Sequence, residues 1–354
     1  MKITIDSGIP FIKGVFEPFA EVRYIPGKQI DASTIRDCDA MIIRTRTRCD
    51  KNLLENSRIR MIATATIGFD HIDLEYCRRN GIEVATAAGC NSRGVLQWVS
   101  SVLAKLSEQD GWLPTQRTLG VVGVGHIGSL VAEYASRWGF RVLCCDPPRQ
   151  RVEKERLLSE GRNEADGATA GFVPFETLAA QSDIITFHVP LQREGDDATW
   201  HMTDKAFFEI IKPGATILNS SRGEVVDNAL LREAVEAGRC RACLDVWEHE
   251  PDIDRRLLAS ALVSTPHIAG YSAQGKANAT AMAVAAVARH FGLPVERFYP
   301  ETVERIQPRP IGWDEMKRTI GKYCDIDAES APLRNSPERF EALRDNYRYR
   351  QEYF

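Results

Sequence analysis

Short apolar segments alternate with longer segments of helical periodicity along most of the chain. This alternation of strands and helices is typical of parallel sheets in an α/β fold. In the first ninety residues the pattern predicts helices near 10–19, 31–36, 51–55 and 73–80. The same stretch predicts strands at 2–5, 21–24, 40–43, 61–63 and 83–85. We therefore expect one open, flavodoxin-like parallel sheet, formed as a substrate domain.

A long helix expected at 92–109 leads into a second set of strands. Asp227 is a good N-cap for a helix at 228–237, and another long helix is expected at 273–291. Because the two long helices can return the chain to the first sheet, we expect a discontinuous domain of residues 1–93 and 270–291. Residues 94–269 are expected to form a second α/β domain, with strands at 119–122, 141–145, 184–188, 215–220, 241–245 and 262–264.

Two segments break the alternation. Residues 149–171 are polar and rich in charge, and we interpret them as a surface connection. From residue 292 onward, prolines divide the chain into short pieces that are too small for an independent core. We expect region 292–354 to pack on the main body or on a second subunit.

The composition fits an ordinary protein of two or three domains, with 354 residues, 44% of them hydrophobic. The net charge of −4 gives no reason to expect a nucleic acid or a membrane surface as a partner. The nine scattered cysteines suit a reducing cytoplasm. Cys240 and Cys243 have the spacing of a redox pair, but they lie in a predicted strand, which favours simple packing. We expect no metal centre.

The first motif that indicates a ligand is a glycine-rich turn between a predicted strand and a predicted helix. Gly123, Gly125 and Gly128 have the spacing G-x-G-x-x-G, and Asp146 follows Gly128 by 18 positions at the end of the next strand. Such a turn lets the backbone approach a pyrophosphate, and the acidic residue accepts hydrogen bonds from a ribose. The motif predicts a bound dinucleotide, and residues 94–269 are therefore expected to form a Rossmann-type NAD-binding domain. Asp146 favours NAD over NADP, although Arg149 lies close enough to pair with a 2′-phosphate.

Three charged or titratable residues follow later strands of the same domain: Arg222, Glu250 and His267. Because ligands of open α/β sheets lie beyond the carboxyl ends of the strands, the three side chains could converge on one site. An arginine can bind a substrate carboxylate, and a histidine oriented by an acid can take a hydroxyl proton. Taken singly, each residue could equally be an ion-paired or loop residue. Together they suit the oxidation of a 2-hydroxy acid.

Three segments carry a resemblance to a known family: 221–223, 245–251 and 265–270. They resemble the three signatures of the D-isomer-specific 2-hydroxyacid dehydrogenases. The resemblance extends over nearly the whole chain, including 89–91, 145–149, 186–188, 275–277 and parts of the tail. In the similar proteins the region corresponding to the tail forms a dimerisation domain, so the resemblance implies a homodimer.

The resemblance also implies roles for individual residues. Arg222 and Glu250 would be active-site residues, and His267 the proton donor or acceptor. The cofactor would be NAD, bound by the glycine turn and by His126, Ile127, Asp146, Val189, Ser220, Ser221, Asp245 and Gly270. The substrate would contact Thr45, Thr66 and Tyr271.

A basic segment follows the strand at 40–43, in which Arg44, Arg46 and Arg48 alternate with Thr45 and Thr47. If the segment stays extended, the arginines share one face. Guanidinium and hydroxyl donors at a strand end could bind a phosphate, whereas a solvated basic edge is the structural alternative. We expect substrate contact from Arg44, Thr45 and Arg46.

The sequence therefore predicts an NAD-dependent dehydrogenase that acts on a small phosphorylated 2-hydroxy acid. Two alternatives remain at this point. One is another member of the same superfamily, of the phosphoglycerate, glycerate or lactate type. The other is an NAD(H)-sensing binding protein that uses this fold for regulated assembly.

Overall fold

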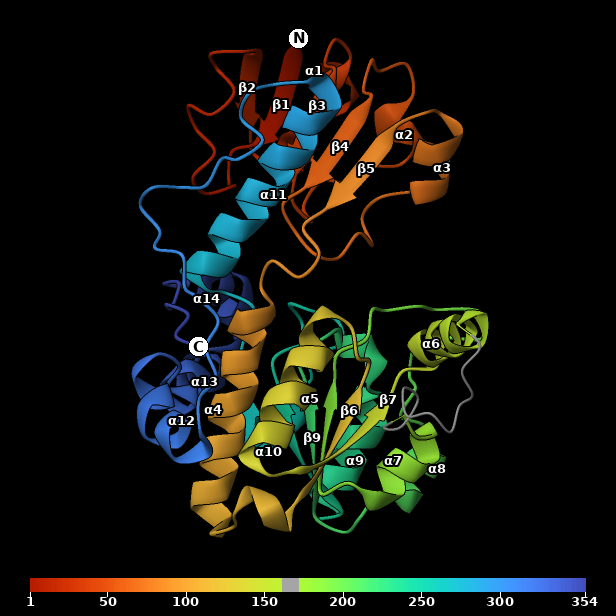
Figure 1. The fold of residues 1–354 in the computed structure, drawn as a ribbon, viewed down its shortest axis with the longest axis vertical. Coiled ribbons are helices and arrows are strands. Elements are labelled where there is room, and N and C mark those ends of the chain that lie inside the picture. Colours follow the sequence, from red (N-terminus) through yellow and green to blue (C-terminus); the bar gives the residue numbers. More distant parts are fainter. Residues whose placement is uncertain (161–171) are drawn as a thin grey trace. The chain divides into compact units, whose positions relative to one another are not determined.

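A computed structural model describes residues 1–160 and 172–354 (Figure 1). It divides into two compact units, one formed by Met1–Asn91 with Ser272–Ile306 and the other by Ser92–Tyr271 with Gln307–Phe354. The region 292–354, which we expected to pack on the main body or on a second subunit, is divided between the two units. Its helices all begin after residue 312, and they bury apolar side chains such as Trp313 and Met316 in the core of the second unit.

The first unit is built on a parallel sheet with the strand order β2-β1-β3-β4-β5. This is the 2-1-3-4-5 order of flavodoxin-like folds, and the five expected strands are confirmed. Both faces of the sheet are buried at its centre, since every residue of β3 and β4 is inaccessible to solvent or nearly so. The strands are β1 Lys2–Asp6, β2 Glu21–Ile25, β3 Ala40–Ile43, β4 Met61–Thr64 and β5 Glu83–Thr86.

Short helices connect these strands, and the long helix α11 (Ala273–Phe291) packs on β4 and β5 (Figure 1). The connecting helices are α1 Ala32–Ile35, α2 Lys51–Leu54 and α3 Leu74–Arg79. The prediction of a helix at 10–19 is wrong. That segment forms turns, with both Phe11 and Gly14 in the left-handed region (φ 64° and 86°), which interrupts a helix.

The second unit contains a parallel sheet with the order β11-β10-β9-β8-β6-β7. Phe172 adds a single parallel bridge to Cys144, on the strand at the outer edge. If this bridge is counted as a short strand, the sheet has the Rossmann order, which begins 3-2-1-4. The predicted Rossmann-type domain is confirmed. The strands are β6 Thr118–Val122, β7 Arg141–Cys145, β8 Ile184–Phe187, β9 Ala215–Asn219, β10 Cys240–Leu244 and β11 Val263–Ser264.

Helices cover this sheet, and the long helix α4 (Ser92–Asp110) packs against α5 (His126–Trp138) (Figure 1). The side chain of Asp227 caps the helix that follows it, as expected, by accepting from the N–H groups of Ala229 and Leu230. The remaining helices of this part are α6 Pro147–Ser159, α7 Phe175–Gln181, α8 Lys205–Ile210, α9 Asn228–Glu236 and α10 Arg255–Ser260.

Helix α6 corrects the interpretation of 149–171 as a surface connection. Residues up to 159 are helical because strong helix formers follow a proline that suits the first turn. Ion pairs one turn apart support the helix, Arg149 with Glu153 and Arg156 with Glu160. The rest of the expected connection, 161–171, lies outside the described residues.

The C-terminal segment forms α12 (Trp313–Thr319), α13 (Ile326–Asn335) and α14 (Phe340–Asp345). These helices pack on the rest of the second unit, which agrees with the expectation that the segment packs on the main body. Helices α12 and α13 contact α4, and α13 also contacts β11. Within the described ranges, no helix combines the length and the apolar character needed to cross a membrane.

Cys240 and Cys243 are buried in β10 as free thiols. Burial raises the pKa of each thiol to about 12, so neither is a reactive thiolate near neutral pH. The expectation of simple packing is confirmed.

Candidate active site

The glycine-rich turn connects β6 to α5 at the carboxyl edge of the sheet. A Cβ on Gly128 would lie 1.8 Å from the carbonyl oxygen of Gly123, so only glycine allows this close packing of helix on turn. Gly125 and His126 are exposed at the start of α5, and Ile127 is partly buried. The first N–H groups of a helix lack partners inside the helix, which makes this turn a site for an anion.

Asp146 lies beside this turn. Its Oδ2 accepts a hydrogen bond from the N–H of Val124 at 2.7 Å, and its Oδ1 accepts from the N–H of Arg149 at 3.0 Å. The Arg149 side chain pairs with Glu153 at 2.9 Å and also donates to the Val124 carbonyl. The carboxylate next to the turn therefore repels a 2′-phosphate, while the nearby guanidinium already has partners.

A dinucleotide fits the residues around the turn. Val189 packs against Gly123, since a Cβ there would meet the Cγ1 of Val189 at 2.7 Å. Among the described residues, the buried Nδ1 of His188 and Oγ of Ser220 have no hydrogen-bond partner. Burial also lowers the pKa of His188 to about 3, so its ring is neutral. Unpaired polar atoms at a strand end suit a polar ligand, because buried polar groups otherwise find partners.

The three catalytic candidates follow three neighbouring parallel strands. Arg222 comes after β9, Glu250 after β10 and His267 after β11, and these strands are adjacent in the sheet. A Cβ on Gly223 would lie 2.0 Å from the backbone of Trp247, so the loops after β9 and β10 are in direct contact. The structure thus brings the predicted residues to one edge of one sheet.

Local hydrogen bonds fix the segment around Arg222. Its carbonyl accepts from the side-chain amide of Asn219 at 2.8 Å, and the N–H of Ser221 donates to the Asn219 Oδ1 at 3.0 Å. The guanidinium of Arg222 contacts the Ser221 carbonyl at 2.8 Å. The backbone at this strand end is therefore fixed by local hydrogen bonds.

His267 and Glu250 are in direct contact. The Nδ1 of His267 lies 2.8 Å from the Oε2 of Glu250, while the Glu250 Oε1 accepts from the N–H of Trp247 at 3.0 Å. An anionic carboxylate accepts, so Nδ1 carries the proton and Nε2 is the nitrogen that can exchange a proton with a substrate. Burial alone would raise the pKa of the Glu250 carboxyl, but the charge and hydrogen bond of His267 and the charge of Arg344 lower it below its usual value.

Asp245 shapes the loop that carries His267. Its carboxylate accepts from Thr265 Oγ1 at 2.6 Å, from the N–H of Ile268 at 2.8 Å and from the N–H of Ala269 at 2.9 Å. These bonds hold His267 in the left-handed region, at φ 58°, which a non-glycine residue rarely adopts. Asp245 therefore acts on the backbone of the histidine loop, which ends at the partly buried Gly270.

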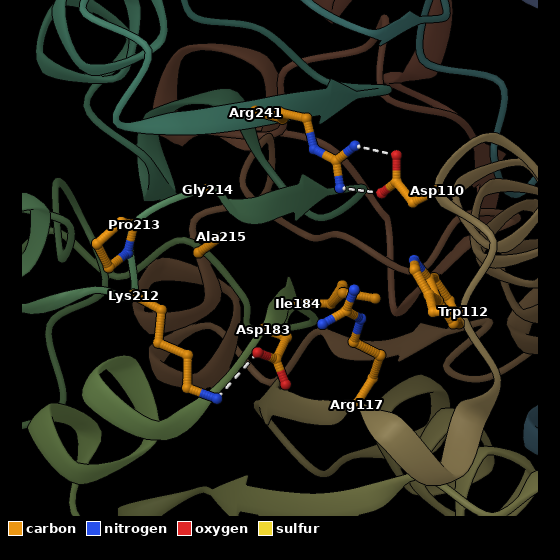
Figure 2. A pocket seen from close by; sticks show the side chains of 10 residues that line it. All are labelled: Asp110, Trp112, Arg117, Asp183, Ile184, Lys212, Pro213, Gly214, Ala215 and Arg241. Atoms are coloured by element: carbon orange, nitrogen blue, oxygen red, sulfur yellow. Dashed lines mark hydrogen bonds and ion pairs between the residues drawn. The ribbon is translucent and has the colours of Figure 1, made fainter.

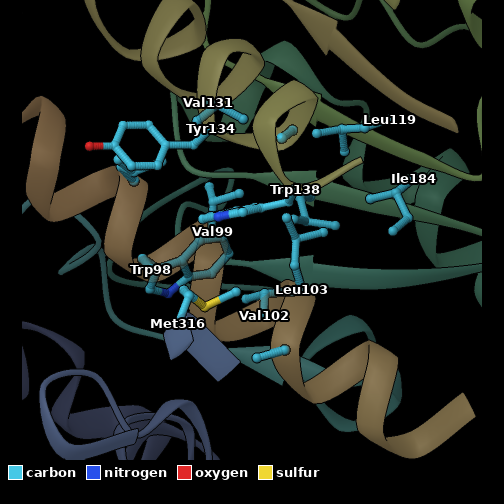
Figure 3. Close-up of a cluster of buried hydrophobic side chains, with 14 of the residues drawn as sticks. Trp98, Val99, Val102, Leu103, Leu119, Val131, Tyr134, Trp138, Ile184 and Met316 are labelled. Carbon is cyan, nitrogen blue, oxygen red and sulfur yellow. The ribbon is translucent and has the colours of Figure 1, made fainter. Parts of the chain in front are cut away.

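Two residues of α4 support this arrangement from behind. The indole N–H of Trp98 donates to Thr265 Oγ1 at 3.0 Å, which continues the chain of hydrogen bonds to Asp245. The side chain of Gln97 forms hydrogen bonds with the backbone of the C-terminal tail, at Gln351 and Tyr353. Figure 3 shows Trp98 and Val99 within an apolar cluster that includes Trp138 of α5 and Met316 of α12.

Tyr271 is the last residue of the range Ser92–Tyr271 of the second unit, and it contacts the C-terminal segment. Its hydroxyl accepts a hydrogen bond from the Nε of Arg344 at 3.1 Å. The Nη1 of Arg344 lies 3.7 Å from the Glu250 Oε2. Arg344 is not among the predicted site residues, because no local pattern connects a residue of the tail to a strand end so far before it.

The other predicted substrate residues belong to the first unit. Arg44 forms an ion pair with the buried Asp6, at 2.9 Å, and Thr45 is exposed. The segment is not extended, because the N–H of Thr47 bonds the Arg44 carbonyl at 3.3 Å and closes a turn. The arginines therefore do not share one face as an extended segment would have them. Arg46 is partly buried, and Thr66 is hydrogen-bonded to Thr64 at 2.6 Å.

A pocket of about 250 Å³ lies at the opposite edge of the second sheet, where the strands begin (Figure 2). Its charged side chains pair with one another, Arg241 with Asp110 at 2.7 Å and Lys212 with Asp183 at 2.9 Å. Arg117 lies over the ring of Trp112. Since ligands of such folds bind at the carboxyl ends of the strands, this ion-paired pocket is not the active site.

The fold agrees with what similarity to known proteins shows. A family described as "D-isomer specific 2-hydroxyacid dehydrogenase, NAD binding domain" matches residues 93–269. The chain is thus a D-isomer-specific 2-hydroxyacid dehydrogenase, with NAD as its cofactor.

Curated relatives identify a more specific family within these dehydrogenases. An erythronate-4-phosphate dehydrogenase from Bacteroides fragilis is 44% identical over 99% of this chain and 97% of its own length. One from Cronobacter sakazakii is 37% identical over 100% of this chain and 92% of its own. Within the 2-hydroxyacid dehydrogenases, the chain belongs to the erythronate-4-phosphate dehydrogenase family.

Solved structures of more distant proteins share the fold. The 3-phosphoglycerate dehydrogenase of Entamoeba histolytica superposes with a TM-score of 0.67 at 22% identity, over 87% of this chain and 99% of that chain. A D-lactate dehydrogenase from Aquifex aeolicus, solved with NAD and lactic acid, gives 0.62 at 24% identity, over 82% and 96%. These chains are almost fully covered, so this protein contains additional structure beyond the shared fold.

Proposed function

We propose that the protein oxidises 4-phospho-D-erythronate to (R)-3-hydroxy-2-oxo-4-phosphobutanoate with NAD⁺, as a step of pyridoxine 5′-phosphate biosynthesis. The names of relatives that match almost the whole chain support the substrate. The observation that carries the chemistry is the 2.8 Å contact between His267 and Glu250 at the carboxyl edge of the cofactor domain.

The Nε2 of His267 takes the proton of the substrate's C2 hydroxyl as the C2–H bond breaks. Glu250 keeps the imidazole in the tautomer with Nδ1 protonated and balances the positive charge that the ring gains. NAD⁺, which the residues of the glycine turn would hold, would supply the acceptor for the hydride from C2. The C2–O bond becomes a carbonyl, so the products are a 2-oxo acid, NADH and one proton that leaves through His267.

Arg222 would bind the substrate carboxylate through parallel hydrogen bonds, for which a guanidinium is suited. For the cofactor, we propose contacts from Gly123, Gly125, His126, Ile127 and Gly128, and from Asp146 at the ribose. Further contacts are proposed from strand ends and the histidine loop, namely Val189, Ser220, Ser221, Asp245 and Gly270. The Asp245 carboxylate also accepts three hydrogen bonds from the histidine loop.

The phosphorylated substrate needs cationic and hydroxyl donors around it. Because the net charge of the protein is −4, this positive charge has to be local. We propose that Arg44, Thr45, Arg46, Thr66 and Tyr271 contact the substrate. Of these residues, Arg44 also forms an ion pair with Asp6.

The test is a screen of turnover with NAD⁺ on D-2-hydroxy acids with and without a terminal phosphate, with a 2-oxo acid added as an acceptor. We expect 4-phosphoerythronate to give the highest kcat/KM. Higher kcat/KM with 3-phosphoglycerate would show that the substrate is assigned wrongly. Binding of NAD(H) without turnover of any acid would indicate a sensing protein instead.

We further propose a cytoplasmic homodimer. The nine free cysteines, eight of them buried, support a reducing compartment. The resemblance of the tail to a dimerisation domain supports the oligomeric state. Light scattering after size-exclusion chromatography tests the dimer, and a mass of about 40 kDa, that of one chain, would exclude it.

A further inference from the structure

The C-terminal helix α14 places one charged side chain at the candidate active site. Arg344 lies in this helix, and its guanidinium is partly buried, with 22% of the side chain exposed. The Nε donates to the hydroxyl of Tyr271 at 3.1 Å, and the Nη1 lies 3.7 Å from the Oε2 of Glu250. The same Oε2 accepts from His267.

The backbone that carries Arg344 is anchored on both sides. Before it, Phe340 is buried in the apolar core of the second unit. After it, the buried guanidinium of Arg350 donates to the carbonyls of Ile268 at 3.2 Å and Gly94 at 2.9 Å, and also to the carbonyl of Ala269. The tail is thus bonded to the loop that follows His267, and the position of Arg344 is fixed relative to that loop.

Tyr271 is surrounded by the same tail. Its ring packs edge-to-face against Tyr347 and against Tyr349, each with ring centres 6.2 Å apart. Together with the hydrogen bond from Arg344, these contacts determine the direction of the phenol. Both Tyr271 and the tail lie beyond residues 93–269, the range matched by the cofactor-domain family.

We propose that Arg344 is a positioning residue of the active site, which orients the Tyr271 hydroxyl toward the substrate and keeps Glu250 in contact with His267. The proposal rests on the proposed function, because it gives Tyr271 and Glu250 their roles. It assigns to the C-terminal segment a part in the chemistry of its own chain, in addition to any part in assembly.

Two physical effects follow from the geometry. A guanidinium beside a carboxylate that is only 17% exposed favours its ionised form, and ionised Glu250 is what holds the imidazole. The planar fork of arginine also donates in two directions at once, to the tyrosine and toward the carboxylate. Lysine has the charge but lacks this fork, so it can preserve only part of the arrangement.

A purely structural role would give a different outcome. If Arg344 only neutralised a buried carboxylate, its loss would lower the stability of the protein and leave the kinetics of the folded fraction unchanged. A positioning role instead changes kcat/KM of folded protein and makes the effect depend on the Tyr271 hydroxyl. A double-mutant cycle separates these roles.

The experiment compares Arg344→Gln, Arg344→Lys, Tyr271→Phe and the double variant Arg344→Gln/Tyr271→Phe with wild type. We expect Arg344→Gln to lower kcat/KM for 4-phosphoerythronate about tenfold or more, with NADH affinity within about twofold of wild type. In the Tyr271→Phe background the same change should cost clearly less. Arg344→Lys should fall between wild type and Arg344→Gln. The control is Arg348→Gln, which removes the same charge from an exposed position of the same tail.

The proposal is overturned if folded Arg344→Gln retains the kcat/KM of wild type, or if its effect is fully additive with that of Tyr271→Phe. Should Arg344→Gln fail to fold, Arg344→Lys decides, and wild-type kinetics of that variant would overturn the proposal. The proposed function fails separately, if wild type itself does not oxidise 4-phosphoerythronate. If wild type prefers another 2-hydroxy acid, the same variants are compared on that acid.

Discussion

The Nδ1 of His267 lies 2.8 Å from the Oε2 of Glu250, although the two residues come from loops after different strands. This contact joins the ends of β10 and β11, which are parallel neighbours. Because Nδ1 is engaged with Glu250, Nε2 is the imidazole nitrogen available for the proposed proton transfer. The first predictions concern these two residues.

His267→Ala should lose turnover and keep the cofactor. A general base typically contributes about 10²–10⁴-fold to the rate, so we expect kcat to fall within that range. The Kd for NADH, measured by fluorescence titration, should stay within about twofold of wild type, because the glycine turn is unchanged. Turnover that survives within a few-fold would remove His267 from the proton-transfer role.

Glu250→Gln tests the charge next to the imidazole with little change in shape. We expect kcat to fall about 10²-fold or more, because the amide cannot stabilise the protonated ring or hold its tautomer as a carboxylate does. Steady-state kinetics at neutral pH measure this. If kcat stays near that of wild type, the carboxylate does not assist His267.

The pKa of Glu250 also predicts a pH dependence of stability. The pKa lies below its usual value of 4.5 in the folded protein, so the ionised carboxylate stabilises the fold. This contribution is fully present above pH 4.5 and is lost as the pH falls through the lower folded-state pKa. The difference in free energy of unfolding between wild type and Glu250→Gln should therefore shrink below pH 4.5. Urea unfolding at several pH values measures it, and a constant difference would contradict the depressed pKa.

Arg46→Gln should weaken binding of the phosphorylated substrate. Loss of a charge-assisted hydrogen bond costs about 1.5–3 kcal/mol, which corresponds to at least a tenfold rise in KM. The KM for unphosphorylated erythronate should change much less. Arg36→Gln removes an exposed arginine of the same unit and serves as the control. An equal rise in KM for both acids would mean that Arg46 does not recognise the phosphate.

Asp146→Ser should reduce the preference for NAD. The carboxylate beside the glycine turn accepts from the Val124 N–H at 2.7 Å and excludes a second anion there. We expect the ratio of kcat/KM for NADP to that for NAD to rise about tenfold or more. An unchanged ratio would indicate that another group selects the cofactor.

Phe354→Ala should destabilise the second unit. The side chain is fully buried and packs against Tyr134 and Tyr353. Truncation of a buried phenylalanine costs about 3–5 kcal/mol, measured as a loss in the free energy of unfolding. Arg348→Ala, at an exposed position of the same tail, should change it by less than about 0.5 kcal/mol.

Much of the fold could be predicted because its signals are local. The strands of both sheets appeared as apolar runs within a few residues of their observed bounds, and the Asp227 cap was recognised from one side chain. Prediction failed where local signals conflict. Residues 10–19 have apolar spacing but contain residues in the left-handed region, and the charged segment after Arg149 becomes a helix through ion pairs one turn apart.

By itself the sequence determined the sheets, the cofactor turn and the three strand-end residues Arg222, Glu250 and His267. Short-range periodicity and motif spacing encode these features, and parallel neighbours bring strand ends to one edge. Only the tertiary structure decided which groups hold that site in place. Asp245 binds the histidine loop through backbone N–H groups, and Arg344 reaches Tyr271 across 73 positions of sequence. Such contacts depend on where distant segments pack, which no local pattern specifies.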